Sequence, residues 1–201
     1  ILMDLENYIE AKNSYQKSFD LDPSAIHIIE RLITISTCLF LLDEIDKYSE
    51  LFNQIGIEGK AINPMSLMYL EDNPENHLNR AIKFNNEIPK SEFPNLYFRK
   101  KDKINIGYFS ADFYTHAVSV LLTRVLELHD QSQFNIYAYS LSKKDDEYTK
   151  RIRDAVYCYR EVSDLGDLEI VDLARDDQLD IAIDLNGYTL NNRASIFSYR
   201  V

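Results

Sequence analysis

The spacing of apolar residues changes once along the chain, near residue 100. In residues 1–90, apolar side chains recur every three or four positions and no alternating run occurs, which is typical of amphipathic helices. From Ile104 onward, short apolar segments alternate with stretches of helical spacing. We therefore predict a helical segment over 1–90, a Pro-containing linker over 91–103 and an α/β lobe over 104–201.

The first helix is similar to the second helix of a tetratricopeptide repeat. Tyr8, Ala11, Tyr15 and Ser18 fall on one helix face, and Pro23 ends the helix. An ordinary amphipathic helix that stops at a proline has the same pattern, so both interpretations stay open.

Three more helices are expected in the N-terminal part. One lies in the apolar stretch 24–42, with Ser24 as its N-cap. Another lies in residues 44–56 and ends at Gly56, and a third runs from Glu75 to Asn86.

Four strands are expected in the C-terminal part, each followed by helical residues. The strand segments are "INIGYFS", "FNIYAYSL", "YCYREVS" and "LDIAIDLN". This alternation predicts a mostly parallel sheet with helices on both faces. Right-handed crossovers would make it a Rossmann-like half-domain, so the fold class is α/β after a helical segment.

Polar bends follow the first and fourth strands. In the common doubly wound order these two strands are neighbours, and ligands bind beyond their carboxyl ends, where the strand order reverses. The bends would then face each other across one crevice. Their polar side chains are Ser110, Asp112, Thr115 and His116 on one side, and Asp184, Asn186, Tyr188 and Thr189 on the other.

His116 is the candidate catalytic residue. It stands before a helix, whose dipole disfavours the charged ring, and a neutral imidazole can accept a proton. Asn186 offers a donor and an acceptor, and Gly187 allows a tight turn close to a ligand. His27, His77 and His129 lack metal-ligand spacing, so no metal site is expected.

Each position also has a purely structural interpretation. His116 can simply satisfy a backbone group, and Asp112 can cap a turn. The Asn186-Gly187 pair is a common tight turn, and Tyr188 can pack over the end of the sheet.

Composition narrows the classes of function. The net charge of −11 and scattered Lys and Arg argue against nucleic-acid binding. The sequence contains neither a G-x-G-x-x-G motif nor a P-loop. Because these loops bind the phosphates of dinucleotides and nucleotides, an NAD or flavin enzyme or a P-loop protein is not expected. Cys38 and Cys158 lack zinc partners and are expected to be buried thiols in a reducing compartment.

No membrane attachment is expected. The longest apolar stretch, Leu32–Leu42, is too short to span a bilayer, and the N-terminus lacks a signal-peptide pattern. We therefore expect a cytoplasmic protein. Because the chain begins without Met and ends abruptly, we also expect an excerpt from a longer protein.

Two motifs resemble those of the protein O-linked N-acetylglucosamine transferases, including the SPINDLY-like members. The segment "GYFSADFYTH" matches the pattern GY-S-DF--H, and "DLNGYTLNNRASIFSYR" matches D-NGYT---R--IF--R; "YAYS" lies between them. The resemblance implies tetratricopeptide repeats followed by a two-lobed GT-B glycosyltransferase. Residues 104–201 would form its first lobe.

The resemblance also implies the reaction: a sugar passes from a nucleotide-sugar donor to a protein Ser or Thr hydroxyl without a metal. N-acetylglucosamine from UDP-GlcNAc is the expected sugar and donor, but fucose transfer also occurs on this family's scaffold, so the donor sugar stays open. His116 would lie beside that hydroxyl. The acceptor cleft would be lined by Asp112, Asn186, Gly187, Tyr188 and Thr189. Ala117 replaces the family's proline after His116, and residues 190–192 replace its Lys-Gly-Ala.

The expected partners are therefore an acceptor protein or peptide and a nucleotide sugar held mainly by a second lobe. That lobe lies outside this sequence, so we expect the isolated chain to be inactive. Two alternatives remain: a tetratricopeptide-type interaction scaffold without catalysis, and another nucleotide-binding Rossmann protein, which the missing glycines disfavour.

Overall fold

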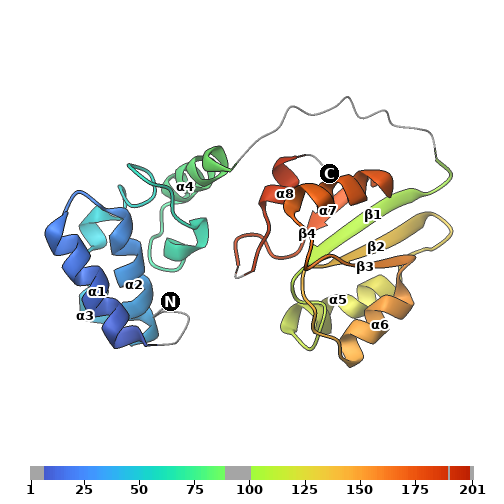
Figure 1. Cartoon of the computed structure of the whole chain (residues 1–201), viewed down its shortest axis with the longest axis horizontal. Helices are drawn as coiled ribbons and strands as arrows, with labels where there is room; N and C mark the ends of the chain where they lie inside the picture. The colour runs from blue at the N-terminus through green and yellow to red at the C-terminus, as the bar shows by residue number, and fades with distance from the viewer. Residues whose placement is uncertain (1–6, 89–100, 190, 200–201) are drawn as a thin grey trace. The chain divides into compact units, whose positions relative to one another are not determined.

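The computed structural model describes residues 7–88, 101–189 and 191–199 and divides the chain into two compact units, Ile1–Ile88 and Pro89–Val201 (Figure 1). A helical unit precedes an α/β unit, which confirms the predicted fold class. Most of the predicted linker, residues 91–100, lies outside the described residues.

All named elements in the described residues of the first unit are helices. Its elements are α1 (Tyr8–Leu21), α2 (His27–Cys38), α3 (Leu42–Asp46), η1 (Ser49–Leu51), η2 (Pro64–Leu67) and α4 (Pro74–Glu87). Asn7 and Asn73 accept backbone N–H groups at the starts of α1 and α4. The assignment of α1 to a tetratricopeptide repeat stays a prediction.

The core of the helical unit lies between α2 and the segments after it. Its apolar side chains have at most 8% of their surface exposed, because α2 carries isoleucines at helical spacing toward the residues that follow. The core residues are Ile29, Ile33, Ile45, Phe52, Ile55, Ile62 and Leu67.

Two predicted helix limits are wrong. Ser24 does not cap α2: its amide and hydroxyl both donate to Asp22 Oδ1, at 3.1 and 2.6 Å, and this turn delays the helix to His27. The stretch 44–56 is not one helix, because α3 ends at Asp46, whose carbonyl accepts the Ser49 hydroxyl at 2.8 Å.

The cysteines are also less buried than expected. Cys38 is exposed, and Cys158 is partly buried. Cys38 is the last residue of α2 and points away from the face that packs on the core. Apolar neighbours in sequence therefore did not place its thiol in the core.

Arg80 of α4 ties the helical unit together. Its side chain is completely buried, and its Nε donates to the Ile55 carbonyl at 2.8 Å. The guanidinium also donates to the Phe52 carbonyl and pairs with Glu71. One side chain thus satisfies two buried carbonyls and neutralises the charge of Glu71, whose other oxygen accepts from Asn76.

Replacing Arg80 should strongly destabilise the helical unit. In an Arg80→Met variant, Glu71 loses its cationic partner and both carbonyls lose their donors, so the free energy of unfolding should fall by about 3–5 kcal/mol. Urea unfolding followed by circular dichroism measures this loss.

Lys47→Ala is the matched control, because its ammonium pairs with Glu44 at 2.9 Å while 61% of the side chain is exposed. The control should leave the free energy of unfolding nearly unchanged, because water screens an exposed ion pair. Equal stability of the two variants would contradict the role of Arg80.

The second unit is built on a parallel sheet. Its strands are β1 (Ile104–Ser110), β2 (Phe134–Ser140), β3 (Cys158–Glu161) and β4 (Ile181–Asp184), in the order β3-β2-β1-β4. The predicted pairing of the first and fourth strands is therefore confirmed. Phe109 lies opposite Asp184, and Ser110 lies opposite Ser140, so these strands end at the same edge.

Helices cover both faces of this sheet, as predicted. The helices α5 (Ala117–Glu127) and α6 (Glu147–Ala155) lie on one face, and α7 (Asp167–Asp176) and α8 (Ser195–Ser198) lie on the other (Figure 1). Alternation along β1 separates the two cores, because Ile106 and Tyr108 point to the first face and Phe109 to the second.

The core under α7 is rich in aromatic rings. The rings of Phe109 and Tyr139 are stacked with their centres 4.3 Å apart, and Phe197 meets Phe109 edge-on. Burial raises the pKa of Tyr139 far above its usual range, and its hydroxyl donates to Asp177 at 2.6 Å.

Among the described helices, none is long and apolar enough to cross a membrane.

Candidate active site

The side chain of Asn186 joins the bends that follow β1 and β4. Its Oδ1 accepts the Ala111 amide at 2.7 Å, and its Nδ2 donates to Asp112 Oδ2 at 3.1 Å. Asn186 is only 4% exposed, so water does not compete for these bonds. The structure thus brings the two predicted bends together at the carboxyl edge of the sheet.

The turn after β4 holds this amide in place. Asp184 Oδ1 accepts the amides of Asn186 and Gly187, at 2.9 and 3.1 Å. Gly187 has a φ of 54°, which a residue without a side chain adopts at low cost. The Thr189 hydroxyl donates to the Asn186 carbonyl at 2.8 Å, and Tyr188 lies half-buried in the same turn. The Asn-Gly pair is therefore both a tight turn and a part of the candidate site.

Asp112 is held from several sides. Its amide donates to Ser110 Oγ at 3.0 Å, and its carbonyl accepts the Ser119 hydroxyl at 2.5 Å. Its carboxylate, 16% exposed, lies between Asn186 and His116. Asp112 therefore has a structural role in the bend and still presents a charge beside the imidazole.

His116 caps helix α5. Its Nδ1 accepts the Val118 amide at 3.3 Å and lies 3.8 Å from Asp112 Oδ2. Because a ring nitrogen that accepts a hydrogen bond carries no proton, the neutral ring is protonated at Nε2 in this arrangement. The side chain is 41% exposed, so the ring can be reached from solvent. The structural interpretation of His116, satisfying a backbone group, describes this state.

Two predicted crevice residues lie elsewhere. Ser110 is completely buried beneath the bend, where it cannot meet a ligand. The Thr115 amide donates to Asp146 Oδ2 at 2.6 Å instead of facing the turn after β4. Asp146 also caps α6, and its hydrogen bond from Thr115 is the largest cause that lowers its pKa to about 2.

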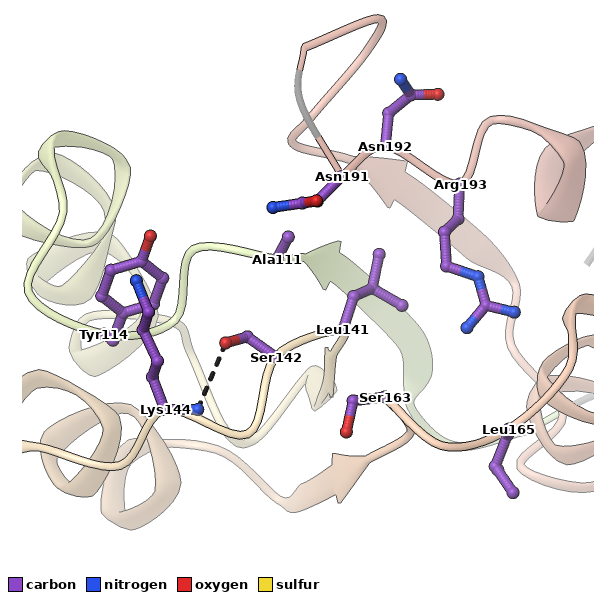
Figure 2. A pocket seen from close by; sticks show the side chains of 10 residues that line it. All are labelled: Ala111, Tyr114, Leu141, Ser142, Lys144, Ser163, Leu165, Asn191, Asn192 and Arg193. Carbon is purple, nitrogen blue, oxygen red and sulfur yellow. Dashed lines mark hydrogen bonds between the residues drawn. The ribbon is translucent and has the colours of Figure 1, made fainter. Parts of the chain in front are cut away.

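A cavity of about 640 Å³ opens at the same edge of the sheet (Figure 2). All four loops that follow the strands contribute to its lining: Ala111, Tyr114, Leu141, Ser142, Lys144, Ser163, Leu165, Asn191, Asn192 and Arg193. The predicted residues Asp112, His116 and Asn186–Thr189 are adjacent to this lining but are not part of it.

Sequence reasoning missed the contributions of the loops after β2 and β3. It considered only the two strands at the point where strand order reverses, whereas parallel strands all end at one edge. That rule, applied to "SLSKKDD" after the second strand, is the signal that could have found Ser142 and Lys144. No group of three or more metal-binding side chains occurs among the described residues.

The sheet order β3-β2-β1-β4 and the polar carboxyl edge are those of a Rossmann-like half-domain. The fold is shared with a K341M mutant of the Thermobaculum terrenum O-GlcNAc transferase, with a TM-score of 0.68 and 22% sequence identity. The match covers 98% of this chain and 39% of that one.

The family follows from the sequence. The profile of glycosyl transferase family 41 matches residues 78–201, and the chain belongs to this family. This confirms the resemblance drawn from the two motifs.

Named relatives agree with this assignment. The probable UDP-N-acetylglucosamine–peptide N-acetylglucosaminyltransferase SPINDLY of Arabidopsis thaliana is 34% identical over 101 residues, 48% of this chain and 11% of that protein. The enzyme SEC from the same plant, with the same description, is 33% identical over 97 residues, 48% of this chain and 10% of that protein. The matched region is thus about a tenth of the length of these relatives.

Removing the Asn186 side chain should destabilise the α/β unit. In Asn186→Ala, the buried Ala111 amide and the Asp112 carboxylate lose their partner, so the free energy of unfolding should fall by about 1–3 kcal/mol. Asn192→Ala removes an exposed bond to the Thr189 carbonyl and should cost less than about 0.5 kcal/mol. Urea unfolding of both variants measures these changes. If Asn186→Ala left the free energy of unfolding nearly unchanged, the hydrogen bonds of Asn186 would not hold the two bends together.

Protonation of Asp146 should release the bend that carries His116. The folded pKa of about 2 lies below the usual value of 3.8, so the stabilisation is complete above about pH 4 and is lost as the pH falls toward 2. The melting temperature of Asp146→Asn should therefore lie below that of the natural chain by a constant amount above pH 4. Below pH 4 this difference should shrink toward zero.

Asp145→Asn controls for loss of a neighbouring carboxylate, since Asp145 pairs with Arg153 at 3.2 Å on the surface. Melting curves between pH 2 and 6 give the comparison. A difference for Asp146→Asn that persists unchanged at pH 2 would refute the prediction.

Proposed function

We propose that this chain forms the acceptor side of an enzyme that transfers N-acetylglucosamine from UDP-GlcNAc to a Ser or Thr hydroxyl of a protein. The observation that carries the proposal is the row Asn186–Asp112–His116 at the carboxyl edge of the sheet. The names of the relatives, which describe peptide N-acetylglucosaminyltransferases using UDP-N-acetylglucosamine, support the substrates.

In the proposed reaction the acceptor hydroxyl oxygen attacks C1 of the sugar, the bond from C1 to the diphosphate breaks, and UDP leaves. The hydroxyl proton passes to Nε2 of His116. A cleft that holds the hydroxyl in line with this bond supplies much of the rate enhancement. By the family resemblance, groups that stabilise the leaving diphosphate come from a second lobe.

The imidazole must change its hydrogen bond before it can accept a proton. A base at Nε2 needs its own proton on Nδ1, which now accepts from Val118. Asp112 Oδ2, 3.8 Å from Nδ1, can accept a hydrogen bond from that proton after a small shift. The capping state would therefore become a basic state when the ring rotates away from Val118, gains a proton at Nδ1 from solvent and loses its Nε2 proton to solvent. Asn186 keeps Asp112 in position to accept the new Nδ1–H.

Further parts of the proposal concern what accompanies the transfer. The nucleotide sugar acts as substrate, no metal takes part, and the protein works in the cytoplasm; these remain predictions. The inactivity of the isolated chain also remains a prediction.

Replacing His116 tests the proposal in the protein that carries both lobes. His116→Ala should lower the rate of sugar transfer by about 10²- to 10⁴-fold, with unchanged donor binding and only the small loss of stability that removal of a helix N-cap causes. Asp112→Asn should lower the rate less and shift the pH profile, because it changes only the partner of the imidazole.

One observation favours the rival scaffold function: His116 already makes a structural bond, as the N-cap of α5. On that account His116→Ala would leave transfer by the two-lobed protein unchanged and would alter only stability. Radiolabelled sugar incorporated into an acceptor peptide separates the two outcomes.

A further inference from the structure

The cavity at the carboxyl edge is a local exception to the acidity of the chain. The chain has 33 Asp and Glu among 201 residues, yet no carboxylate occurs among the described residues that line the cavity. Two cations, Lys144 and Arg193, do line it (Figure 2). The cavity is therefore suited to an anionic group.

Only one of these cations is available. The Arg193 guanidinium pairs with Asp167, through Nε at 2.5 Å and through a second nitrogen. Lys144 forms no ion pair within the described residues, whereas its neighbour Lys143 pairs with Asp164 at 2.6 Å. Lys144 thus supplies the uncompensated positive charge.

The position of the Lys144 ammonium is defined by an aromatic ring. Its Nζ lies 3.9 Å from the centre of the Tyr114 ring, a cation–π contact along the border of the cavity (Figure 2). The Lys144 amide donates to Ser142 Oγ at 3.2 Å, which fixes the backbone of the same loop. A cation held against a ring face keeps N–H donors for a further acceptor.

A carboxylate fits this site better than a phosphate does. A phosphate carries up to two charges, and sites that bind it commonly add an arginine fork or free N–H groups of a helix N-terminus to any lysine present. Here the Arg193 fork is paired, and the start of α7 carries Asp167 and a bond from the Gly166 amide to Glu169 at 2.7 Å. A single ammonium remains, which matches the single charge of a carboxylate.

The same ring places the cation near His116. The centres of the Tyr114 and His116 rings are 5.8 Å apart. The Lys144 ammonium lies 3.9 Å from the Tyr114 ring centre, and the His116 ring centre lies 5.8 Å from it. The distance from the ammonium to the imidazole therefore cannot exceed the sum of these two distances. About three residues of an extended peptide cover that span.

We infer that the cavity binds the Asp or Glu side chain of an acceptor polypeptide, about three residues from the hydroxyl that receives the sugar, with Lys144 as its partner. This inference rests on the proposed function and names a preference among acceptor proteins: sites flanked by an acidic residue.

The test uses synthetic peptides with one Ser and a Glu three residues before or after it, and their Gln counterparts. Each is titrated into the isotope-labelled 201-residue chain, and dissociation constants come from NMR shifts. One of the two Glu peptides, with Glu either before or after the Ser, should bind about threefold more tightly than its Gln counterpart. Lys144→Gln should abolish this difference, and Lys143→Gln should preserve it.

Several results would overturn the inference. These are equal binding of Glu and Gln peptides, no measurable binding of either, or a Glu preference that survives Lys144→Gln. Inorganic pyrophosphate that binds at Lys144 more tightly than the Glu peptide would make the cavity a phosphate site instead.

The same titration separates this inference from the proposed function. A peptide that shifts the signals of both the Lys144 loop and the His116 ring supports both. A Glu preference that depends on Lys144 but leaves the His116 ring unshifted supports an acidic-peptide site and contradicts its use in transfer to the Ser hydroxyl.

Discussion

The candidate site depends on one buried amide. Asn186 accepts the Ala111 amide and donates to the Asp112 carboxylate, so one side chain joins segments that lie far apart in the sequence. Buried polar groups are costly unless each finds a partner, which makes this geometry specific. The turn at Asp184 fixes Asn186, Asn186 fixes Asp112, and Asp112 stands beside His116. The position of the imidazole therefore follows from the pairing of β1 with β4.

The same network explains what the bend after β1 cannot do. Four amides in and just after the bend already have side-chain partners: those of Ala111, Asp112, Thr115 and Val118. A dinucleotide fold leaves such amides for a pyrophosphate. Gly107 lies inside β1, where an added side-chain carbon would collide with Leu179, so its role is packing. Nucleotide contacts are thus expected outside this bend.

Much of this arrangement could be predicted from the sequence, because parallel α/β sheets follow few topologies. The strands, their helices and the meeting of the two bends all followed from spacing and order. The remainder depended on contacts that carry no local signal. The bond from Thr115 to Asp146 joins a bend to the cap of a later helix. Lys144 lies in a loop without a motif, so only the rule that parallel strands end at one edge places it near the site.

The Ala111 amide reports on the central tether most directly. It lies beyond the last residue of β1, so its protection from solvent depends on the 2.7 Å bond to Asn186. Amide hydrogen exchange of the 201-residue chain, followed by NMR, measures that protection. The Ala111 amide should exchange as slowly as the central amides of β1. Exchange at the rate of exposed loop amides would show that the two bends are not joined as described.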